Sequence, residues 1–220
     1  MRVFVAGATG ATGQVFLQHA DGLDLVLHVR PKTAATHALG KDPRARVFDL
    51  TDAAALDAAL RGCDAVLCLV GTMRKRFDTG DTYETSDVGP TRLLVEACRR
   101  VGVPRFVLMS SFGAGGMGAY MQAKGAQERI VRDSGLAFAI FRPSALASPG
   151  GAPAGHHGAR DVPGFVLAAG AGLAKLPGVG PLVDDWRAMP LDVLARAFRH
   201  ALAGELDGKI LSGRDIWKYA

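Results

Sequence analysis

The chain has 220 residues, 49% of them hydrophobic and 21% charged, which is typical of a globular protein and excludes a disordered chain. That length fits one domain with a sizeable core, so we expect residues 1–220 to form a single domain. No apolar run reaches the roughly 18 residues that span a bilayer, and residues 2–6 lead directly into a strand pattern, unlike a signal peptide. We therefore expect a cytoplasmic protein with no membrane association.

Charge and cysteine content exclude further classes. The net charge is +5, but the densest basic cluster is only Arg74-Lys75-Arg76, so a nucleic-acid partner is not expected. Cys63, Cys68 and Cys98 are odd in number and lack Cys-x-x-Cys spacing, which argues against a disulfide framework and a zinc site. A small-molecule substrate is the expected partner, with the protein a monomer or a homodimer.

Apolar runs alternate with helical patterns along the chain. Short buried or alternating runs predict strands, and longer periodic runs closed by glycine or proline predict helices. The predicted strands are 3–6, 23–29, 46–48, 65–70, 106–109 and 136–141. The predicted helices are 11–20, 53–60, 90–100, 120–133 and 191–202, with a short apolar helix over 165–176. Because strands that alternate with helices need crossover connections, the predicted fold class is α/β: a Rossmann-type, doubly wound parallel sheet with helices on both faces.

The pattern changes after Phe141. Residues 148–164 are rich in Gly, Pro and Ala, and we expect 143–190 to form a flap on the substrate side. The adjacent His156 and His157 could bind a metal, but no acidic or cysteine partner stands at a ligand spacing. No metal site is therefore predicted.

A glycine-rich turn between the first strand and the first helix predicts a dinucleotide site. Gly7, Gly10 and Gly13 have the spacing G-x-x-G-x-x-G. The first glycine suits a tight turn, the second a close approach of the backbone to a pyrophosphate, and the third close packing of the helix. Helix N-terminal amides then face the negative charge. The predicted phosphate-binding residues are Gly7, Thr9, Gly10, Ala11, Thr12 and Gly13.

The end of the second strand indicates which cofactor binds. An acidic side chain there would bind a ribose 2′-hydroxyl and favour NAD, but this chain has Arg30, which suits a 2′-phosphate. We therefore expect NADP (NADPH) in preference to NAD. Asp49, after the third strand, could bind the adenine amino group, and Gly71, after the fourth, allows close approach to the ribose. Their neighbours complete this part of the predicted site: Leu50, Val70 and Thr72.

Tyr120 and Lys124 form a Tyr-x-x-x-Lys pair on one face of the predicted helix 120–133. An ammonium beside a phenol favours proton donation by the phenol and can hold a nicotinamide ribose, so Lys124 is expected to serve both catalysis and cofactor binding. Ser110 and Ser111 end the preceding strand, at the sheet edge where ligands bind in this architecture. Either hydroxyl could orient a carbonyl.

These motifs together resemble the atypical short-chain dehydrogenases/reductases of the NAD(P)H-binding type. The segments Phe106-Val-Leu-Met-Ser-Ser-Phe-Gly-Ala and Tyr120-Met-Gln-Ala-Lys-Gly-Ala-Gln-Glu are similar to the branch of HIV Tat-interacting oxidoreductase-like proteins, as are Phe141-Arg-Pro and Trp186-Arg-Ala-Met-Pro. The resemblance implies that Tyr120, Lys124 and Ser111 are catalytic, with Ser110 as the alternative serine. It also implies that Arg142 and Pro143 lie beside the nicotinamide.

Three functions agree with these residues. The first is an NADPH-dependent oxidoreductase that transfers hydride to a small carbonyl or related acceptor. The second is a non-catalytic NADP(H)-binding redox sensor, which would not need the proton donor Tyr120. The third is an NAD(P)-dependent sugar-nucleotide epimerase, which is disfavoured because only about 80 residues follow Phe141, little for a nucleotide-sugar lobe. The sequence favours the first function.

Overall fold

A central parallel sheet dominates the protein. The structure is a computed structural model that describes residues 1–71, 80–147 and 188–220. Seven strands run in the order β3-β2-β1-β4-β5-β6-β9, and every neighbouring pair is parallel. They are β1 (Arg2–Ala6), β2 (Asp24–Val29), β3 (Ala45–Val47), β4 (Ala65–Cys68), β5 (Arg105–Met109), β6 (Ala137–Arg142) and β9 (Lys209–Ser212). A second, two-stranded sheet pairs β7 (Leu146–Ala147) with β8 (Met189–Pro190).

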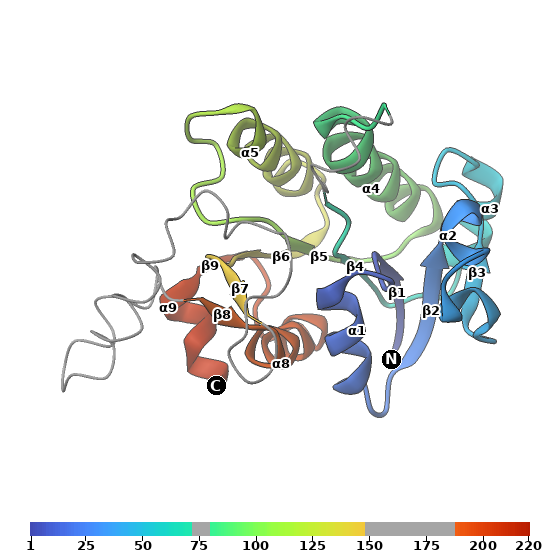
Figure 1. Ribbon diagram of the computed structural model, residues 1–220, viewed down its shortest axis with the longest axis horizontal. Coiled ribbons are helices and arrows are strands. Elements are labelled where there is room, and N and C mark those ends of the chain that lie inside the picture. Colours follow the sequence, from blue (N-terminus) through green and yellow to red (C-terminus); the bar gives the residue numbers. More distant parts are fainter. Residues whose placement is uncertain (72–79, 148–187) are drawn as a thin grey trace.

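Helices cover both faces of the large sheet (Figure 1). Helices α1 (Ala11–Gln18) and α8 (Leu191–Leu202) lie on one face, and α3 (Ala53–Leu60), α4 (Gly89–Val101) and α5 (Ala119–Arg132) lie on the other. Shorter helical segments are α2 (Pro31–Ala34), η1 (Ala38–Lys41), the π-helical turn η3 (Glu84–Val88), α9 (Gly213–Ile216) and η4 (Trp217–Tyr219).

Each face of the sheet has its own apolar core. On one face, Phe198 of α8 packs edge-on against Phe16 of α1 and Phe141 of β6, with ring centroids 6.3 and 4.9 Å apart. On the other face, Leu60 and Leu94 are fully buried with the side chains of alternate strand positions. This division explains why the central strands read as continuous apolar runs, since both of their faces are covered.

The predicted α/β fold class is confirmed. The six predicted strands and the helices predicted over 11–20, 53–60, 90–100, 120–133 and 191–202 are all present, with ends shifted by at most two residues. The sequence prediction missed β9, a four-residue edge strand that alternates only weakly between buried and exposed positions. The predicted helix 165–176 and residues 148–164 lie outside the described part of the chain, so the flap over 143–190 and the single-domain organisation stay predictions.

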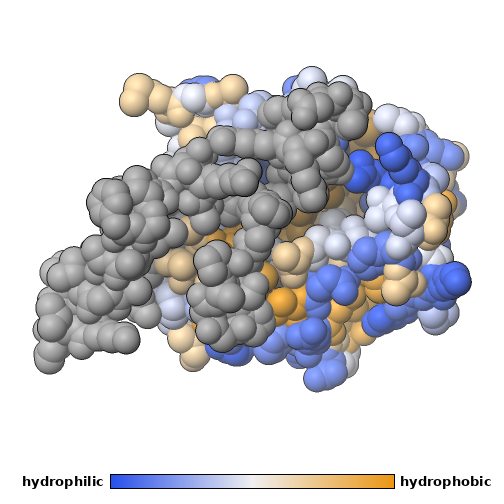
Figure 2. Space-filling model, viewed as in Figure 1, coloured by the Kyte–Doolittle hydropathy of each residue, from blue (hydrophilic) through white to orange (hydrophobic). Residues whose placement is uncertain are grey.

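The strand order positions a crevice at the carboxyl edge of the sheet. From β1 the chain builds outward through β2 and β3, whereas β4, β5 and β6 extend in the other direction. The connections therefore diverge between β1 and β4, and in open α/β sheets ligands bind outside the carboxyl ends of the strands at such a point. In the view of Figure 2, hydrophobic side chains are visible near the middle of the molecule, with hydrophilic side chains to the right of them and below them.

Candidate cofactor and active site

The turn after β1 depends on close backbone packing at two of its three glycines. A Cβ atom on Gly7 would lie 2.8 Å from the Leu69 carbonyl, and the φ of Gly7 is +93°, which other residues rarely adopt. A Cβ on Gly13 would lie 2.5 Å from the carbonyl oxygen of Gly7. At Gly10, in contrast, the nearest atom would be 3.4 Å away, so the folded chain itself does not require glycine there. Gly10 is thus the position that suits close approach by an external group.

The start of α1 presents unpaired backbone donors to this turn. The first N–H groups of any helix lack intrahelical acceptors, and here the N-cap residue Gly10 has no side chain to satisfy them. The first turn of α1 also contains no acidic residue. Gln14 donates a hydrogen bond of 2.8 Å from Nε2 to the carbonyl of Ala8, which ties the helix to the turn. These features make the start of α1 suitable for an anion.

A cavity of about 750 Å³ opens at the carboxyl edge of the sheet, a volume within the range of cofactor sites. It gathers residues that follow β1 through β6. The sequence-predicted residues that line it are Gly7, Thr9, Gly10, Ala11, Thr12, Gly13, Arg30, Asp49, Leu50, Val70, Gly71, Ser110, Ser111, Tyr120, Lys124 and Pro143. Thr72 lies outside the described residues.

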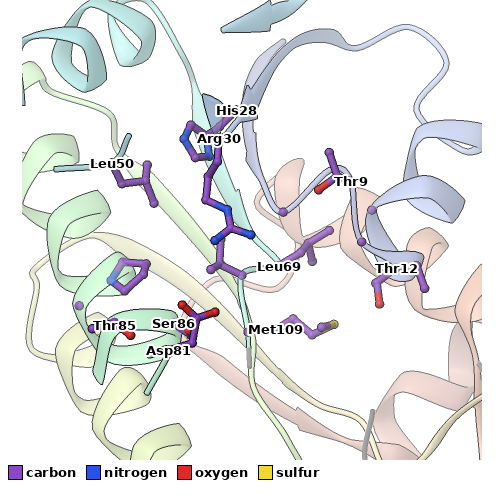
Figure 3. Close-up of a pocket in the computed structure, with 18 of the residues that line it drawn as sticks. Thr9, Thr12, His28, Arg30, Leu50, Leu69, Asp81, Thr85, Ser86 and Met109 are labelled. Atoms are coloured by element: carbon purple, nitrogen blue, oxygen red, sulfur yellow. The ribbon is translucent and has the colours of Figure 1, made fainter. Parts of the chain in front are cut away.

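Arg30 follows β2, and its exposed side chain points into the cavity (Figure 3). The guanidinium extends between Thr9 and Thr12 on one side and Thr85 and Ser86 on the other. The Arg30 guanidinium therefore lies across the cavity from the start of α1. A group attached to the adenosine half of a dinucleotide would be expected at this guanidinium.

His28 is buried beneath Arg30. Its Nε2 atom is 2.9 Å from the carbonyl oxygen of Phe48, and its ring stacks on the ring of Phe4 and meets the ring of Phe48 edge-on. Burial lowers the pKa of His28, and repulsion from Arg30 adds to the effect, although the hydrogen bond to the Phe48 carbonyl works against it. The imidazole is therefore neutral at pH 7, and Arg30 carries positive charge at this end of the cavity.

Tyr120 and Lys124 both face the cavity from α5. Lys124 Nζ lies 5.7 Å from the centroid of the half-buried Tyr120 ring, which also contacts Tyr83 at 5.9 Å between centroids. Lys124 is buried, and its Nζ forms an ion pair of 2.9 Å with Oδ1 of Asp87. Burial opposes the ammonium charge, but attraction from Tyr120 and Asp87 outweighs it, and the pKa of Lys124 is raised. Lys124 is therefore a cation across the physiological pH range.

The two serines after β5 have different surroundings. The buried Ser110 donates a hydrogen bond of 2.6 Å from Oγ to Oε1 of Glu128, a buried residue of α5. Ser111 is half-buried, and its Oγ has only a long contact of 3.4 Å with the carbonyl of Phe112. Both serines line the cavity, but the Ser111 hydroxyl is the less committed to the protein.

Arg142, predicted beside the nicotinamide, does not line the cavity. Its Nε and Nη2 atoms donate hydrogen bonds of 2.8 and 2.5 Å to the two carboxylate oxygens of Glu128. This pairing raises the pKa of Arg142 and directs its guanidinium to α5. Pro143, the next residue, does reach the cavity. Of the two residues expected beside the nicotinamide, the structure therefore brings Pro143 to the cavity but not Arg142.

The cavity also contains residues that the sequence prediction missed. Thr85 and Ser86 come from the π-helical turn, and Pro90 and Leu93 from the first turns of α4. A helix that follows β4 begins at the carboxyl edge of the sheet, and Pro90 marks that beginning in the sequence. Asp87, the partner of Lys124, had no such signal, because its pairing joins residues that are distant in sequence.

Neither a metal site nor a membrane segment is found in the part of the chain that the structure describes. Within residues 1–71, 80–147 and 188–220, no three His, Cys, Asp or Glu side chains gather as a metal site would require. His156 and His157 lie outside these ranges. None of the described helices combines the length and apolar character that crossing a bilayer requires.

Comparisons with known proteins agree with this geometry. The NAD(P)H-binding family matches residues 7–163 of the chain. An uncharacterized chloroplastic protein of Arabidopsis thaliana is 31% identical over 167 residues, which cover 66% of this chain and 59% of that protein. HTATIP2 of Rattus norvegicus is 29% identical over 153 residues, which cover 66% of this chain and 62% of HTATIP2. The match to HTATIP2 confirms the resemblance drawn from the sequence motifs.

Solved structures share the fold. The UDP-glucuronic acid 4-epimerase from Bacillus cereus, in complex with NAD, aligns with 96% of this chain and 77% of its own length, with a TM-score of 0.63. The two sequences are 19% identical, so this likeness concerns the fold alone. The family match indicates a nicotinamide dinucleotide as the cofactor.

Proposed function

The chain belongs to the NAD(P)H-binding family, and we propose that it is an NADPH-dependent oxidoreductase that reduces a small carbonyl or related acceptor. One observation carries the proposal. Tyr120, Lys124 and Ser111 line the same cavity as the glycine turn that starts at Gly7. A cofactor with its phosphates on that turn could therefore extend its nicotinamide toward a proton donor.

The cofactor-binding residues follow from their places around the cavity. The amides from Gly10 to Gly13 would bind the pyrophosphate, and Arg30 would bind the 2′-phosphate through charged hydrogen bonds. Asp49 and Leu50 would contact the adenine. Gly71 leaves space for the nicotinamide ribose, because a Cβ there would lie 3.4 Å from Lys124 Nζ.

The catalytic residues would act on the acceptor from α5 and the end of β5. NADPH bound on the glycine turn would supply a hydride to the carbonyl carbon of the acceptor. Tyr120 would donate its phenolic proton to the carbonyl oxygen and regain a proton from solvent. Ser111 would hold the carbonyl oxygen by a hydrogen bond, and Lys124 would keep a positive charge beside Tyr120 and bind the ribose.

Sugar-nucleotide epimerisation is the second candidate. The observation that favours it is the fold shared with the NAD-bound UDP-glucuronic acid 4-epimerase over 96% of this chain. An epimerase would use the same tyrosine and lysine but would return the hydride to its substrate, so the cofactor would not be consumed. A redox sensor would bind the cofactor without any turnover.

Cofactor titrations test the proposal first. NADPH and NADH are titrated in parallel by fluorescence against the wild-type chain, Arg30→Ala and Arg99→Ala, which removes an exposed arginine of α4 outside the cavity. We expect the preference for NADPH to shrink by about 1–3 kcal/mol in Arg30→Ala, as for loss of a charged hydrogen bond, and to persist in Arg99→Ala. An unchanged preference in Arg30→Ala would remove Arg30 from the 2′-phosphate site.

Turnover then separates the three functions. The wild-type chain and Tyr120→Phe are assayed with NADPH against small aldehydes and ketones, and with NAD against UDP-sugars. An oxidoreductase oxidises NADPH, and Tyr120→Phe loses this activity while it still binds the cofactor. Interconversion of UDP-sugars without net cofactor consumption would support the epimerase. Tight binding with no turnover in either assay would support the sensor.

A further inference from the structure

Asp87 is a fully buried carboxylate with unusually few partners. Its side chain is 0% exposed, and apart from the Lys124 ammonium no donor among the described residues makes a hydrogen bond to its carboxylate oxygens. Its compensation is the ion pair of 2.9 Å with Lys124 Nζ, whose side chain is 3% exposed. A buried charge is costly unless it is paired, so each member of this pair depends on the other.

The backbone around Asp87 is held by two helices. Asp87 lies in the π-helical turn η3, immediately before α4. Its carbonyl oxygen accepts hydrogen bonds from Thr91 Oγ1 at 2.9 Å and from Gln127 Nε2 at 3.0 Å. Gln127 Nε2 also donates to Thr91 Oγ1 at 2.7 Å. Because Gln127 follows Lys124 by three residues on α5, one helix contacts Asp87 through both its backbone and its side chain. Single π turns often occur at functional sites.

The Asp87–Lys124 pair borders the cavity at Gly71. A Cβ atom added to Gly71 would lie 3.4 Å from Lys124 Nζ and 3.6 Å from Asp87 Oδ1. Gly71 and Lys124 both line the cavity. The absence of a side chain at position 71 thus leaves the ammonium accessible to a bound group.

We propose that Asp87 is a positioning residue that keeps the Lys124 ammonium charged and fixed in place at the cavity wall. This inference rests on the proposed function, in which Lys124 binds the cofactor ribose. A buried lysine without a counter-ion tends to lose its proton, and its flexible stem allows other rotamers. Asp87 prevents both. A stability role alone explains the pair poorly, because buried ion pairs are often no more stabilising than apolar residues of similar size.

Three titratable groups face Lys124 within the part of the chain that the structure describes. They are Asp87 from the π-helical turn, Tyr120 from α5 itself and Cys68 from β4. Cys68 is buried, and burial raises the pKa of its thiol, so it is uncharged at neutral pH. At neutral pH Asp87 is therefore the group whose formal negative charge balances Lys124.

The test uses the full chain and the isosteric variant Asp87→Asn. Asp57→Asn is the matched control, since it also removes one carboxylate from an ion pair, but on the surface of α3 with Arg100. The first measurement is the ¹⁵N NMR titration of the Lys124 Nζ signal, assigned with Lys124→Met and performed without cofactor. The second is the Kd for NADPH by fluorescence at pH 7.

The expected results concern both charge and binding. The ordinary pKa of a lysine is 10.5, and the pKa of Lys124 is raised above it. In the wild type and in Asp57→Asn, Lys124 should therefore stay protonated above pH 10.5. In Asp87→Asn burial remains and the counter-charge is gone, so Lys124 should titrate at a lower pH than it does in the wild type. NADPH affinity should fall roughly tenfold or more in Asp87→Asn. In a Lys124→Met background, the same substitution should cause no further loss.

Several results would overturn the proposal. They are an unchanged titration of Lys124 in Asp87→Asn, an unchanged NADPH affinity, or an equal loss of affinity in the Lys124→Met background. If the wild type binds no NADPH, the proposed function fails, but the Lys124 titration still decides whether Asp87 controls its charge. If Asp87→Asn does not fold, Thr91→Val serves instead, because it keeps both charges and removes a hydrogen bond to the Asp87 carbonyl. A weaker affinity for NADPH would then support the proposal, and an unchanged one would refute it.

Discussion

Replacement of Glu128 by Gln should lower the free energy of unfolding of the protein. Glu128 is 3% exposed and accepts one hydrogen bond from Ser110 and two from Arg142. Glutamine keeps the shape but loses the charge and turns one acceptor into a donor. Breaking a buried pair costs about 3–5 kcal/mol, and we expect about 2–3 kcal/mol here because the Arg142 side chain is 32% exposed.

Urea and thermal unfolding followed by circular dichroism at pH 7 measure this loss. At roughly 2–4 °C per kcal/mol for a chain of this size, the melting temperature should fall by about 4–12 °C. The control is Glu205→Gln, whose exposed pair with His200 should contribute at most about 1 kcal/mol. A loss in Glu128→Gln no larger than in the control would refute the view that Glu128 anchors α5.

The hydrogen bond between Ser110 and Glu128 predicts different effects for substitutions of the two serines. Because the Ser110 hydroxyl is engaged with Glu128, Ser110→Ala should lower the free energy of unfolding and change turnover only moderately. Ser111→Ala should leave stability nearly unchanged and lower kcat, since its hydroxyl is the one left to hold a carbonyl oxygen. If Ser110→Ala proved the more damaging to kcat at equal stability, Ser110 would take that role instead.

Two further predictions concern the cofactor end of the cavity. Gly13→Ala should lower the free energy of unfolding by about 1–3 kcal/mol, because its Cβ would lie 2.5 Å from the Gly7 carbonyl oxygen. Gly10→Ala should leave the free energy of unfolding unchanged and weaken NADPH binding. Urea unfolding and fluorescence titration of both variants check this contrast. Burial lowers the pKa of His28 below its ordinary 6.5, so its contribution to stability is complete above pH 6.5 and is lost as the pH falls through the lower folded value. Urea unfolding at pH 7 and pH 5 should therefore reveal a loss that is smaller in His28→Gln.

The sequence predicted the fold well because its evidence is local. Continuous apolar runs such as 65–68 and 106–109 are strands covered on both faces. In the turn between β1 and α1, Gly7 and Gly13 are required because a Cβ atom at either position would clash with the backbone. Weakly patterned elements were missed. The edge strand β9 has one covered edge and alternates little, and the π-helical turn η3 accepts a tertiary hydrogen bond from Gln127, which is distant in sequence.

The site was predicted in part for the same reason. Tyr120 and Lys124 are one helical turn apart, so a local rule places them together. The partners that fix them are not local. Asp87 pairs with Lys124 from 37 residues away, and Arg142 pairs with Glu128 although its position at the end of β6 suggested a place beside the nicotinamide. A strand-end position predicts where the backbone lies, but only packing decides which charged group the side chain meets.

The ion pairs of Lys124 and Glu128 fix the position of α5, and with it the position of Tyr120 at the carboxyl edge of the sheet. The Asp87–Lys124 pair joins α5 to the turn before α4, and the Glu128–Arg142 pair joins it to the end of β6. Lys124 and Glu128 are themselves one helical turn apart, so a rotation or a slide of α5 would break at least one of the two ion pairs. Tyr120 lies one turn before Lys124 on the same face, and its hydroxyl-bearing ring is thereby constrained relative to the two serines that follow β5. In the proposed function, the groups that would face the acceptor are the neutral hydroxyls of Tyr120 and Ser111, whereas Lys124 and Glu128 are each paired with an opposite charge within the protein. This arrangement suits the transfer of a proton to an oxygen that becomes anionic only during the reaction.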